Sequence, residues 1–234
     1  MYMDWTYIIL VLPAVLFSMW ASARVSNTFK KYSRVHNSRG LTADAAARYI
    51  LDRNGLQNVR IEHISGELTD HYDPSANVIR LSDSVYGNSS TAAVGVACHE
   101  TGHAIQHAVG YTPVKIRTAI VPVTNFGSKL SVPLIIVGLL LASFSEVFIM
   151  LAYFGVLCFS LCVVFQLVTL PTEFNASNRA LRCIEENGLL TGDELAGAKK
   201  TLSAAAMTYV AALAVSIMQL LRFALIVAGS NRRN

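Results

Sequence analysis

The stretch SVPLIIVGLLLASFSEVFIMLAYFGVLCFSLCVVFQLVTL, residues 131–170, decides how this chain folds. Its only charged residue is Glu146. At about 40 residues it is too long for one membrane helix, since about 20 apolar residues cross a bilayer and about 25 are the upper range. The polar break SFSE, residues 143–146, divides it into two arms. We therefore predict a transmembrane helical hairpin over residues 131–170, whose two ends lie on the same face of the membrane.

Apolar stretches also stand near both ends of the chain. Residues 5–23 carry no charge and have a Trp near each end, which is typical of a membrane span. We therefore predict a transmembrane anchor over residues 1–23. A cleaved signal peptide is the alternative, but it would begin with basic residues, whereas this chain begins MYMD. Residues 204–228 form the last apolar stretch and predict a C-terminal membrane helix.

Composition and charge indicate the same class of protein. Hydrophobic residues make up 53% of the chain and charged residues only 15%, whereas about a quarter of a soluble domain is charged. The net charge of +4 is too small and too scattered to indicate a nucleic-acid partner. Five Lys and Arg residues lie between positions 24 and 39, before Asp44, and basic residues beside a span mark the cytoplasmic side. Residues 24–130 are therefore expected in the cytoplasm.

The segments outside the apolar stretches combine helical and β patterns. The expected elements are a helix over 41–55, a strand over 59–64, a hairpin over 68–81 turned at DPSAN, a helix over 91–110 and a polar, cytoplasmic helix segment over 171–203. The sequence therefore predicts a mostly α polytopic membrane protein with a small β-sheet.

The motif HETGH, residues 99–103, lies inside one of these expected helices. Residues four apart share a helix face about 6 Å apart along the axis, so His99 and His103 can direct two imidazole nitrogens at one ion. This is the spacing of H-E-x-x-H zinc peptidases, in which the intervening Glu is the general base. Glu100 lies about 100° round the helix, where it can take a proton from a Zn²⁺-bound water. A five-residue pattern also arises by chance in unrelated chains, so a third ligand is needed to support the prediction of a zinc site.

Two residues compete for the third ligand position. His107 follows at the same spacing, but eight residues of helix measure about 12 Å while Zn–N bonds are about 2 Å, so His99 and His107 would strain to meet at one ion. His107 is therefore expected to pack beside the site or to support a ligand. Glu173 is the better candidate, because the hairpin returns it to the face of His99. In this interpretation Pro171 begins a new helix, and the alternative for Glu173 is an acid that stabilises its first turn.

Three segments together, HETGH, QLVTLPTEFNASNRAL and LTDHYDP with the LS and VY that follow it, resemble the YugP-type neutral zinc metallopeptidases, a family of bacterial membrane proteins. More distantly the chain resembles the HtpX and CAAX-processing gluzincins, which add a later Glu in an E-x-x-x-D helix. The resemblance implies a zincin-like α+β catalytic domain, Zn²⁺ bound by His99, His103 and Glu173, and Glu100 as the base. Ser177 stands where the gluzincins have Asp, so a carboxylate that would orient a ligand His is missing there.

Further residues are candidates for binding the substrate or the transition state. The strand VIRLS, residues 78–82, is the candidate edge strand beside which a substrate peptide could add, with an ordinary core strand as the alternative. His71, Tyr72 and Tyr209 are candidate donors to a developing oxyanion, with structural hydrogen bonding as the alternative for each.

The sequence thus predicts a membrane-embedded zinc metalloendopeptidase, multi-pass in a bacterial cell membrane, with its active site facing the cytoplasm. Its expected partners are a peptide or protein substrate, which could itself be membrane-associated, and the lipid bilayer; nucleic acid is not expected and the oligomeric state stays open. The alternatives are a zinc-dependent amidase acting on a lipid-linked substrate and a non-enzymatic membrane protein that binds metal. Glu100 argues against the last, because a structural zinc site needs no base and fills all four positions with protein ligands.

Overall fold

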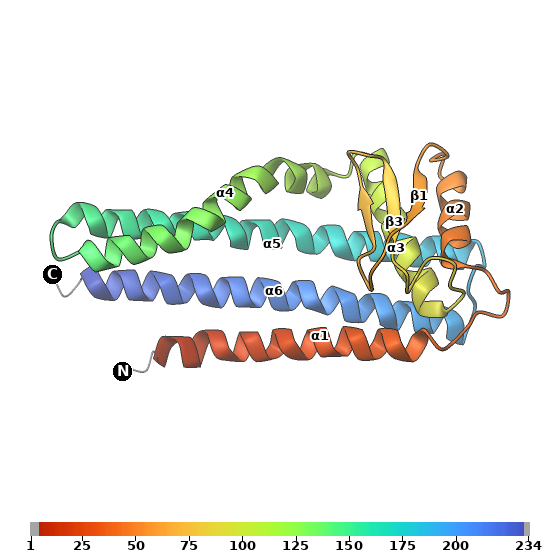
Figure 1. The fold of residues 1–234 in the computed structure, drawn as a ribbon, viewed down its shortest axis with the longest axis horizontal. Coiled ribbons are helices and arrows are strands. Elements are labelled where there is room, and N and C mark those ends of the chain that lie inside the picture. Colours follow the sequence, from red (N-terminus) through yellow and green to blue (C-terminus); the bar gives the residue numbers. More distant parts are fainter. Residues whose placement is uncertain (1–4, 232–234) are drawn as a thin grey trace. The chain divides into compact units, whose positions relative to one another are not determined.

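The computed structural model describes residues 5–231, most of which are helical (Figure 1). The helices are η1 (Tyr7–Val11), α1 (Leu12–Tyr32), α2 (Ala43–Arg53), α3 (Thr91–Ala108), α4 (Thr112–Leu141), α5 (Glu146–Glu186) and α6 (Asp193–Asn231). The strands β1 (Arg60–His63), β2 (His71–Asp73) and β3 (Val78–Leu81) form one sheet. The predicted mostly helical class with a small sheet is confirmed.

The chain divides into two compact units. The apolar unit comprises Met1–Trp20, Ile116–Leu170 and Tyr209–Asn234, and the polar unit comprises Ala21–Lys115 and Pro171–Thr208. All of α3 and the last part of α5 belong to the polar unit. The candidate metal ligands from these two helices therefore fall in one unit.

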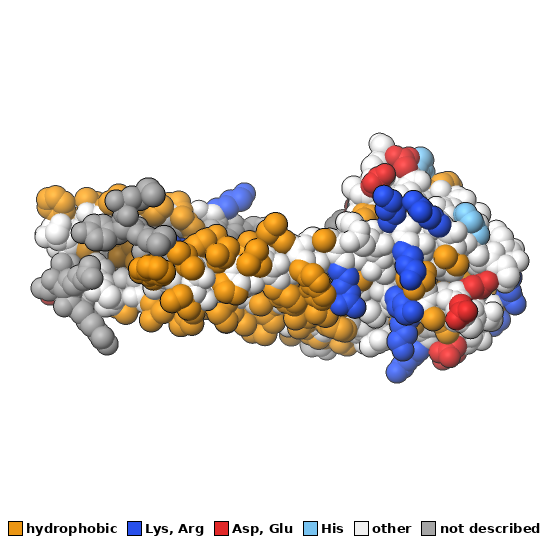
Figure 2. Space-filling view, turned by 90° about the horizontal axis from the view of Figure 1, so that it is seen from below, with side chains coloured by type: hydrophobic (Ala, Val, Ile, Leu, Met, Phe, Trp, Pro, Cys, Tyr) orange, Lys and Arg blue, Asp and Glu red, His pale blue; other side chains and the backbone are white. Residues whose placement is uncertain are grey.

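Four of the described helices are long and apolar enough to cross a membrane. They are Tyr7–Tyr32, Thr112–Leu141, Glu146–Glu186 and Asp193–Ser230. Large hydrophobic side chains such as Phe126, Leu140 and Leu157 are exposed on them. Figure 2 shows hydrophobic side chains over much of the surface of these helices, where few charged side chains appear. A continuous apolar surface on helices is what a lipid-facing surface requires.

α5 is longer than the sequence predicts. It runs through Pro171, so the prediction that a new helix begins there is wrong. A proline inside a helix removes one hydrogen bond and costs about 3 kcal/mol. Thr172, Ala176 and Ala180 stand at helical spacing and are buried, and their packing favours continuing the helix across the proline. Glu173 therefore lies in mid-helix, and the alternative in which it stabilises a helix start does not apply.

α4 begins earlier than predicted, at Thr112, within residues 24–130, which are expected outside the membrane. Pro113 is the second residue of the helix, and proline is tolerated in a first turn because the N–H groups there have no intrahelical partner. Pro122 and Pro133 lie inside the helix. Figure 1 shows α4 changing direction along its length, which internal prolines cause. α4 ends and α5 begins on either side of the SFSE turn.

The polar segment expected over 171–203 is not a separate element, because the structure divides it between α5 and α6. α6 is a single helix that starts with Asp193 and Glu194 in its first turn, where acidic side chains interact favourably with the helix dipole. It continues without interruption into the last apolar stretch.

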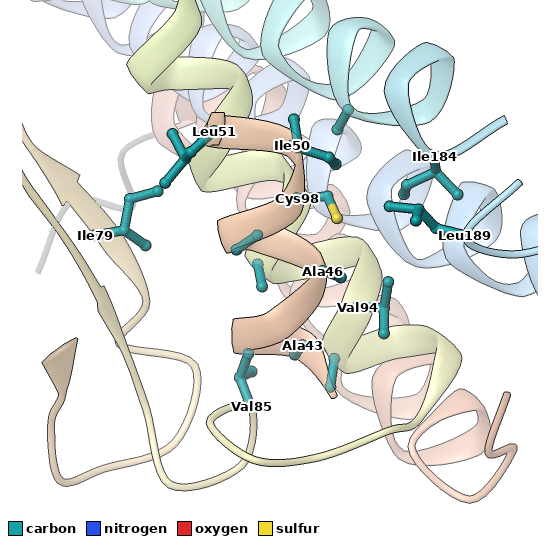
Figure 3. Close-up of a cluster of buried hydrophobic side chains, with 14 of the residues drawn as sticks. Ala43, Ala46, Ile50, Leu51, Ile79, Val85, Val94, Cys98, Ile184 and Leu189 are labelled. Atoms are coloured by element: carbon teal, nitrogen blue, oxygen red, sulfur yellow. The ribbon is translucent and has the colours of Figure 1, made fainter. Parts of the chain in front are cut away.

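The core of the polar unit surrounds α2. This helix is rich in Ala, and two of its four charged residues, Asp44 in the first turn and Arg53 in the last, match the helix dipole. Figure 3 shows Leu51 on the side of Ile79 in β3, and Ile50 on the side of Ile184 in α5. α2 thus packs between the sheet and the helices that carry the candidate ligands.

The sheet has the order β1-β3-β2, with β3 parallel to β1 and antiparallel to β2. The prediction that residues 78–82 form the edge strand for substrate is therefore wrong. The backbone of β3 is paired on both sides, and Val78, Ile79 and Leu81 are fully buried, as in a core strand. β2 lies at an edge of the sheet instead and contacts α3.

Two carboxylates of the LTDHYDP segment hold this hairpin together. Asp70 Oδ1 accepts a hydrogen bond from the Ser82 N–H at 2.8 Å, and burial raises the pKa of Asp70. Asp73 Oδ2 accepts from Arg80 at 2.9 Å, and this contact lowers the pKa of Asp73. These contacts therefore hold β2 against β3.

Candidate metal centre

α3 carries both motif histidines and is almost wholly buried. The hydroxyl oxygen of Ser90 caps the helix by accepting from the Ala93 N–H at 3.3 Å. At Gly102 an added Cβ would clash with the carbonyl oxygen of Ala176 in α5. Only glycine permits so close an approach of two backbones. This crossing of α3 and α5 brings Glu173 to the histidines.

Three side-chain atoms meet at this crossing. His99 Nε2 and His103 Nε2 are 3.1 Å apart, and Glu173 Oε2 lies 3.3 Å from the first and 3.4 Å from the second. Ligands placed tetrahedrally about zinc, with bonds of about 2.0–2.1 Å, are about 3.3 Å from one another. The two nitrogens and the oxygen therefore have both the spacing and the chemistry of three ligands of one zinc ion.

The other ring nitrogen of each histidine is also held. His99 Nδ1 lies 3.0 Å from Ser177 Oγ, and His103 Nδ1 lies 3.0 Å from Gln106 Oε1. An amide oxygen only accepts, so the proton of this second contact belongs to His103 Nδ1, which leaves its Nε2 lone pair for a metal. Gln106 donates in turn to the carbonyl oxygen of Thr172 at 2.8 Å. The ring orientations are thus set by α3 and α5 together.

The charges at this position favour a cation. Burial opposes a positive charge on His103, but the neighbouring carboxylates of Glu173 and Glu100 outweigh it and raise the pKa of His103. The carboxylate of Glu173 is buried, whereas the side chains of His99 and His103 keep 15% and 13% of their surface exposed. A metal ion held here would be accessible from one side.

Glu100 is anchored by the edge strand of the sheet. Its Oε2 accepts a hydrogen bond from the backbone N–H of Tyr72 in β2 at 2.9 Å. Glu100 is buried and does not belong to the group of three ligand atoms. The carboxylate therefore has a fixed orientation, with Oε1 as its second oxygen for chemistry.

The remaining candidate residues lie around this group or away from it. The ring of His107 packs edge-on against Tyr72, with centroids 5.5 Å apart. The hydroxyl of Tyr72 donates to an amide oxygen in the β2–β3 turn at 3.1 Å. His71 Nδ1 contacts the carbonyl oxygen of Thr69 at 2.9 Å. Tyr209 belongs to the apolar unit, and its role at an oxyanion stays a prediction.

Gln106 is the site residue that the sequence analysis misses. Its Nε2 also donates to Asn175 Oδ1 at 3.0 Å, and this oxygen accepts from Arg179 at 2.7 Å. The signal was present in the sequence, because Gln106 follows His103 by three residues in a helix of mostly small and apolar residues. A buried polar side chain of this kind needs a partner, and the adjacent turn offers a histidine.

Fold and site together define a helical membrane protein with a two-histidine, one-glutamate group able to hold a metal. Residues 7–228 match the family described as "Putative neutral zinc metallopeptidase", and the chain belongs to this family. It is 46% identical over 228 residues to the "Putative membrane protease YugP" of Bacillus subtilis (strain 168), an alignment that covers 97% of this chain and 99% of that protein. No solved structure matches the chain.

Proposed function

We propose that the chain is a zinc metalloendopeptidase that crosses the cell membrane several times and hydrolyses peptide bonds with Glu100 as general base. The observation that carries the proposal is the spacing of His99 Nε2, His103 Nε2 and Glu173 Oε2, which are 3.1 to 3.4 Å apart. Three protein ligands leave a fourth position for water or substrate, as in catalytic zinc sites. Membership of a zinc metallopeptidase family supports the same activity, and the helix–sheet packing around α3 supports a zincin-like catalytic domain.

A bound zinc ion would supply Lewis-acid chemistry, because it polarises a carbonyl group and lowers the pKa of water to about 7. The protein's own residues would carry out the proton transfer and hold the reacting groups in position. Glu100 Oε1 would accept the proton of the attacking water and pass it to the leaving amine. The contact of Glu100 Oε2 with the Tyr72 N–H, at 2.9 Å, orients the base before substrate binds. Ser177 and Gln106 keep the two imidazole rings aligned.

The substrate peptide would lie along β2. An extended peptide adds to an exposed sheet edge through main-chain hydrogen bonds, and β2 is an edge strand next to α3. Because the Tyr72 N–H donates to Glu100, a peptide on this edge would pass the base. This mode of binding suits an unfolded or extended segment of a protein, and the membrane setting suits a membrane-associated substrate.

The active site would face the cytoplasm. The five basic residues between positions 24 and 39 follow the first apolar stretch directly, which favours the cytoplasmic side by the positive-inside rule. Both parts of the polar unit would then share that side, one before and one after the α4–α5 hairpin.

Replacement of Glu100 tests the proposal. Glu100→Gln keeps the shape of the side chain but removes the base, and leaves the three candidate ligands in place. Zinc should remain bound while hydrolysis of labelled peptides falls by about 10² to 10⁴, the usual contribution of a general base. Purified full-length protein, loaded with zinc and assayed beside the variant, gives both measurements.

The same assay separates the alternatives. Wild-type cleavage of a lipid-linked amide with no cleavage of any peptide would favour the amidase. Zinc bound without turnover of either substrate class would favour a structural metal site. Peptide hydrolysis that is unchanged in zinc-loaded Glu100→Gln would contradict the role of Glu100 as base.

A further inference from the structure

A groove lies in the polar unit, and of its lining residues only Ser177 has a part in the proposed hydrolysis. It encloses about 320 Å³ and is lined by residues of α1, α5 and α6. Arg24 comes from α1 and Lys199 from α6, and none of the lining residues is acidic. The charged side chains that line the groove are therefore all basic, which suits an anion.

The rest of the lining is divided between polar and apolar side chains. Asn178 of α5 and Ser203 of α6 offer hydrogen bonds. Phe174 and Met207 offer apolar surface, over a floor that includes Leu202, which is buried. A ligand that fills this groove should thus have an anionic, hydrogen-bonding part and an apolar part.

The position of the groove along its helices identifies such a ligand. Arg24, Phe174 and Met207 each stand within about one helical turn of the point at which their helix enters the apolar unit. Lys199 lies farther from that point, about two turns beyond Met207 on α6. If the apolar stretches lie in a bilayer, the apolar wall stands at the boundary of the hydrocarbon and the cations at the level of the lipid headgroups.

We propose that this groove binds one anionic phospholipid, with its phosphate between Arg24 and Lys199 and an acyl chain against Phe174 and Met207. The guanidinium and ammonium groups donate charge-assisted hydrogen bonds to phosphate. A polar headgroup and an apolar chain match the two kinds of lining in one molecule. The proposal goes beyond the proposed hydrolysis and does not depend on it.

One side chain is shared between the groove and the candidate metal centre. Ser177 lines the groove and also lies 3.0 Å from His99 Nδ1. A bound lipid would therefore contact the residue that orients this histidine, which connects the membrane to the candidate metal centre through a single hydroxyl group.

Lipid retention by the full-length protein tests the proposal. The protein in detergent would be incubated with phosphatidylglycerol or phosphatidylcholine, and native mass spectrometry would count the retained lipids. We expect one phosphatidylglycerol, retained in preference to phosphatidylcholine. The double variant Arg24→Gln/Lys199→Gln should bind it about 25-fold more weakly, since a cation near a membrane surface contributes about fivefold in affinity.

Matched variants separate the groove from general surface charge. Arg34→Gln/Lys200→Gln removes the same charge at exposed positions outside the groove, and should leave phosphatidylglycerol binding within about twofold of the wild-type value, since it spares both lining cations. Ser203→Trp fills the groove without changing charge and should abolish retention. Helix content and thermal unfolding, measured on each variant by circular dichroism, report that the protein is folded.

Three results would overturn the proposal. The first is equal weakening by the two double variants. The second is unchanged retention in folded Ser203→Trp. The third is displacement of phosphatidylglycerol by millimolar inorganic phosphate, which would assign the groove to the free anion. None of these results bears on peptide hydrolysis, so failure of the lipid site leaves the proposed activity to its own test.

Discussion

At the scale of single residues, the two histidines of the candidate metal centre are supported by neutral groups. Ser177 holds His99 through a hydroxyl and Gln106 holds His103 through an amide. A carboxylate in either place would raise the basicity of the imidazole and add negative charge beside the metal. Neutral partners orient the rings without that charge. A zinc ion held by such rings would keep more of its own positive charge.

The third ligand is tested by a pair of substitutions. Glu173→Gln replaces a charged ligand with a weaker neutral one, so zinc content and activity should fall together, and added zinc should partly restore both. His107→Ala removes a ring that packs on Tyr72 and should keep one zinc per chain. Metal analysis of the two purified variants provides the measurement. Loss of zinc in His107→Ala with retention in Glu173→Gln would reverse the assignment.

The support of His99 is tested by Ser177→Ala. Loss of a group that orients a ligand histidine typically lowers metal affinity by 10- to 100-fold, and we expect about this loss of zinc affinity, measured by competition with a chelator. Asn178→Ala is the control, because Asn178 is the next residue of α5 and is exposed. Equal affinities in the two variants would mean that the hydroxyl of Ser177 does not position His99.

The sequence predicts which side chains meet at the candidate metal centre, but not the groups that hold the two histidines. His99 and His103 belong to one helix, and their spacing follows from helix geometry alone. Glu173 could be argued only through the membrane hairpin, because it is distant in sequence. The hydroxyl group that holds His99 belongs to Ser177, 78 residues away in the sequence. The gluzincin motif has Asp at this position, so the motif indicates only that a carboxylate is missing there. Such contacts depend on how α3 and α5 cross.

At the scale of elements, close helix crossings position the candidate metal centre. α3 meets α5 at Gly102, opposite Ala176. It also meets α6 at Gly95, where an added Cβ would lie 3.2 Å from the Cβ of Ala198. Small residues on both sides of each crossing let the helices approach closely. The distance between α3 and α5 in turn decides whether Glu173 reaches the histidines.

Gly102→Ala tests this crossing. The new Cβ would clash with the backbone of α5 and force the helices apart, so we expect a destabilisation of about 1–3 kcal/mol together with weaker zinc binding. Gly229→Ala is the matched control in α6, since an added Cβ there meets nothing within 4 Å. It should be neutral or stabilising by up to about 1 kcal/mol. Unfolding in denaturant and metal content would be measured on both variants. Equal stability and equal zinc content in Gly102→Ala and Gly229→Ala would contradict the role of this helix crossing.

At two places in the fold, tertiary packing overrides what the local sequence predicts. A proline normally marks a helix boundary, yet α5 passes through Pro171 because the buried residues after it continue the helical spacing. The strand 78–81 reads V-I-R-L, and three apolar residues out of four are consistent with a buried central strand. Strand order is a tertiary property, so the sequence predicts that β3 exists without deciding that β2, rather than β3, forms the edge.

At the scale of the whole molecule, the candidate metal centre and the membrane topology depend on each other. α3 precedes α4 in the chain, and Glu173 lies on α5 after it. The polar unit nevertheless contains both His99 and Glu173. If α4 and α5 each cross a membrane, these two crossings return the chain to the side of His99, as a site that includes Glu173 requires. A single crossing would separate the ligands.

This topology is tested by labelling three introduced cysteines, one at a time, in a variant in which the four native cysteines are replaced. Ser65→Cys and Glu185→Cys lie at exposed positions of the polar unit, before and after the hairpin, and Ser143→Cys lies at the exposed turn between α4 and α5. A membrane-impermeant maleimide should label the first two only in inverted vesicles and the third only in intact cells. Zinc content confirms that each variant is folded.

Labelling of all three from the reversed sides would change only the orientation and place the site outside the cell. Labelling of Ser65→Cys and Glu185→Cys from opposite sides would separate α3 from Glu173 and remove both the hairpin and the third ligand.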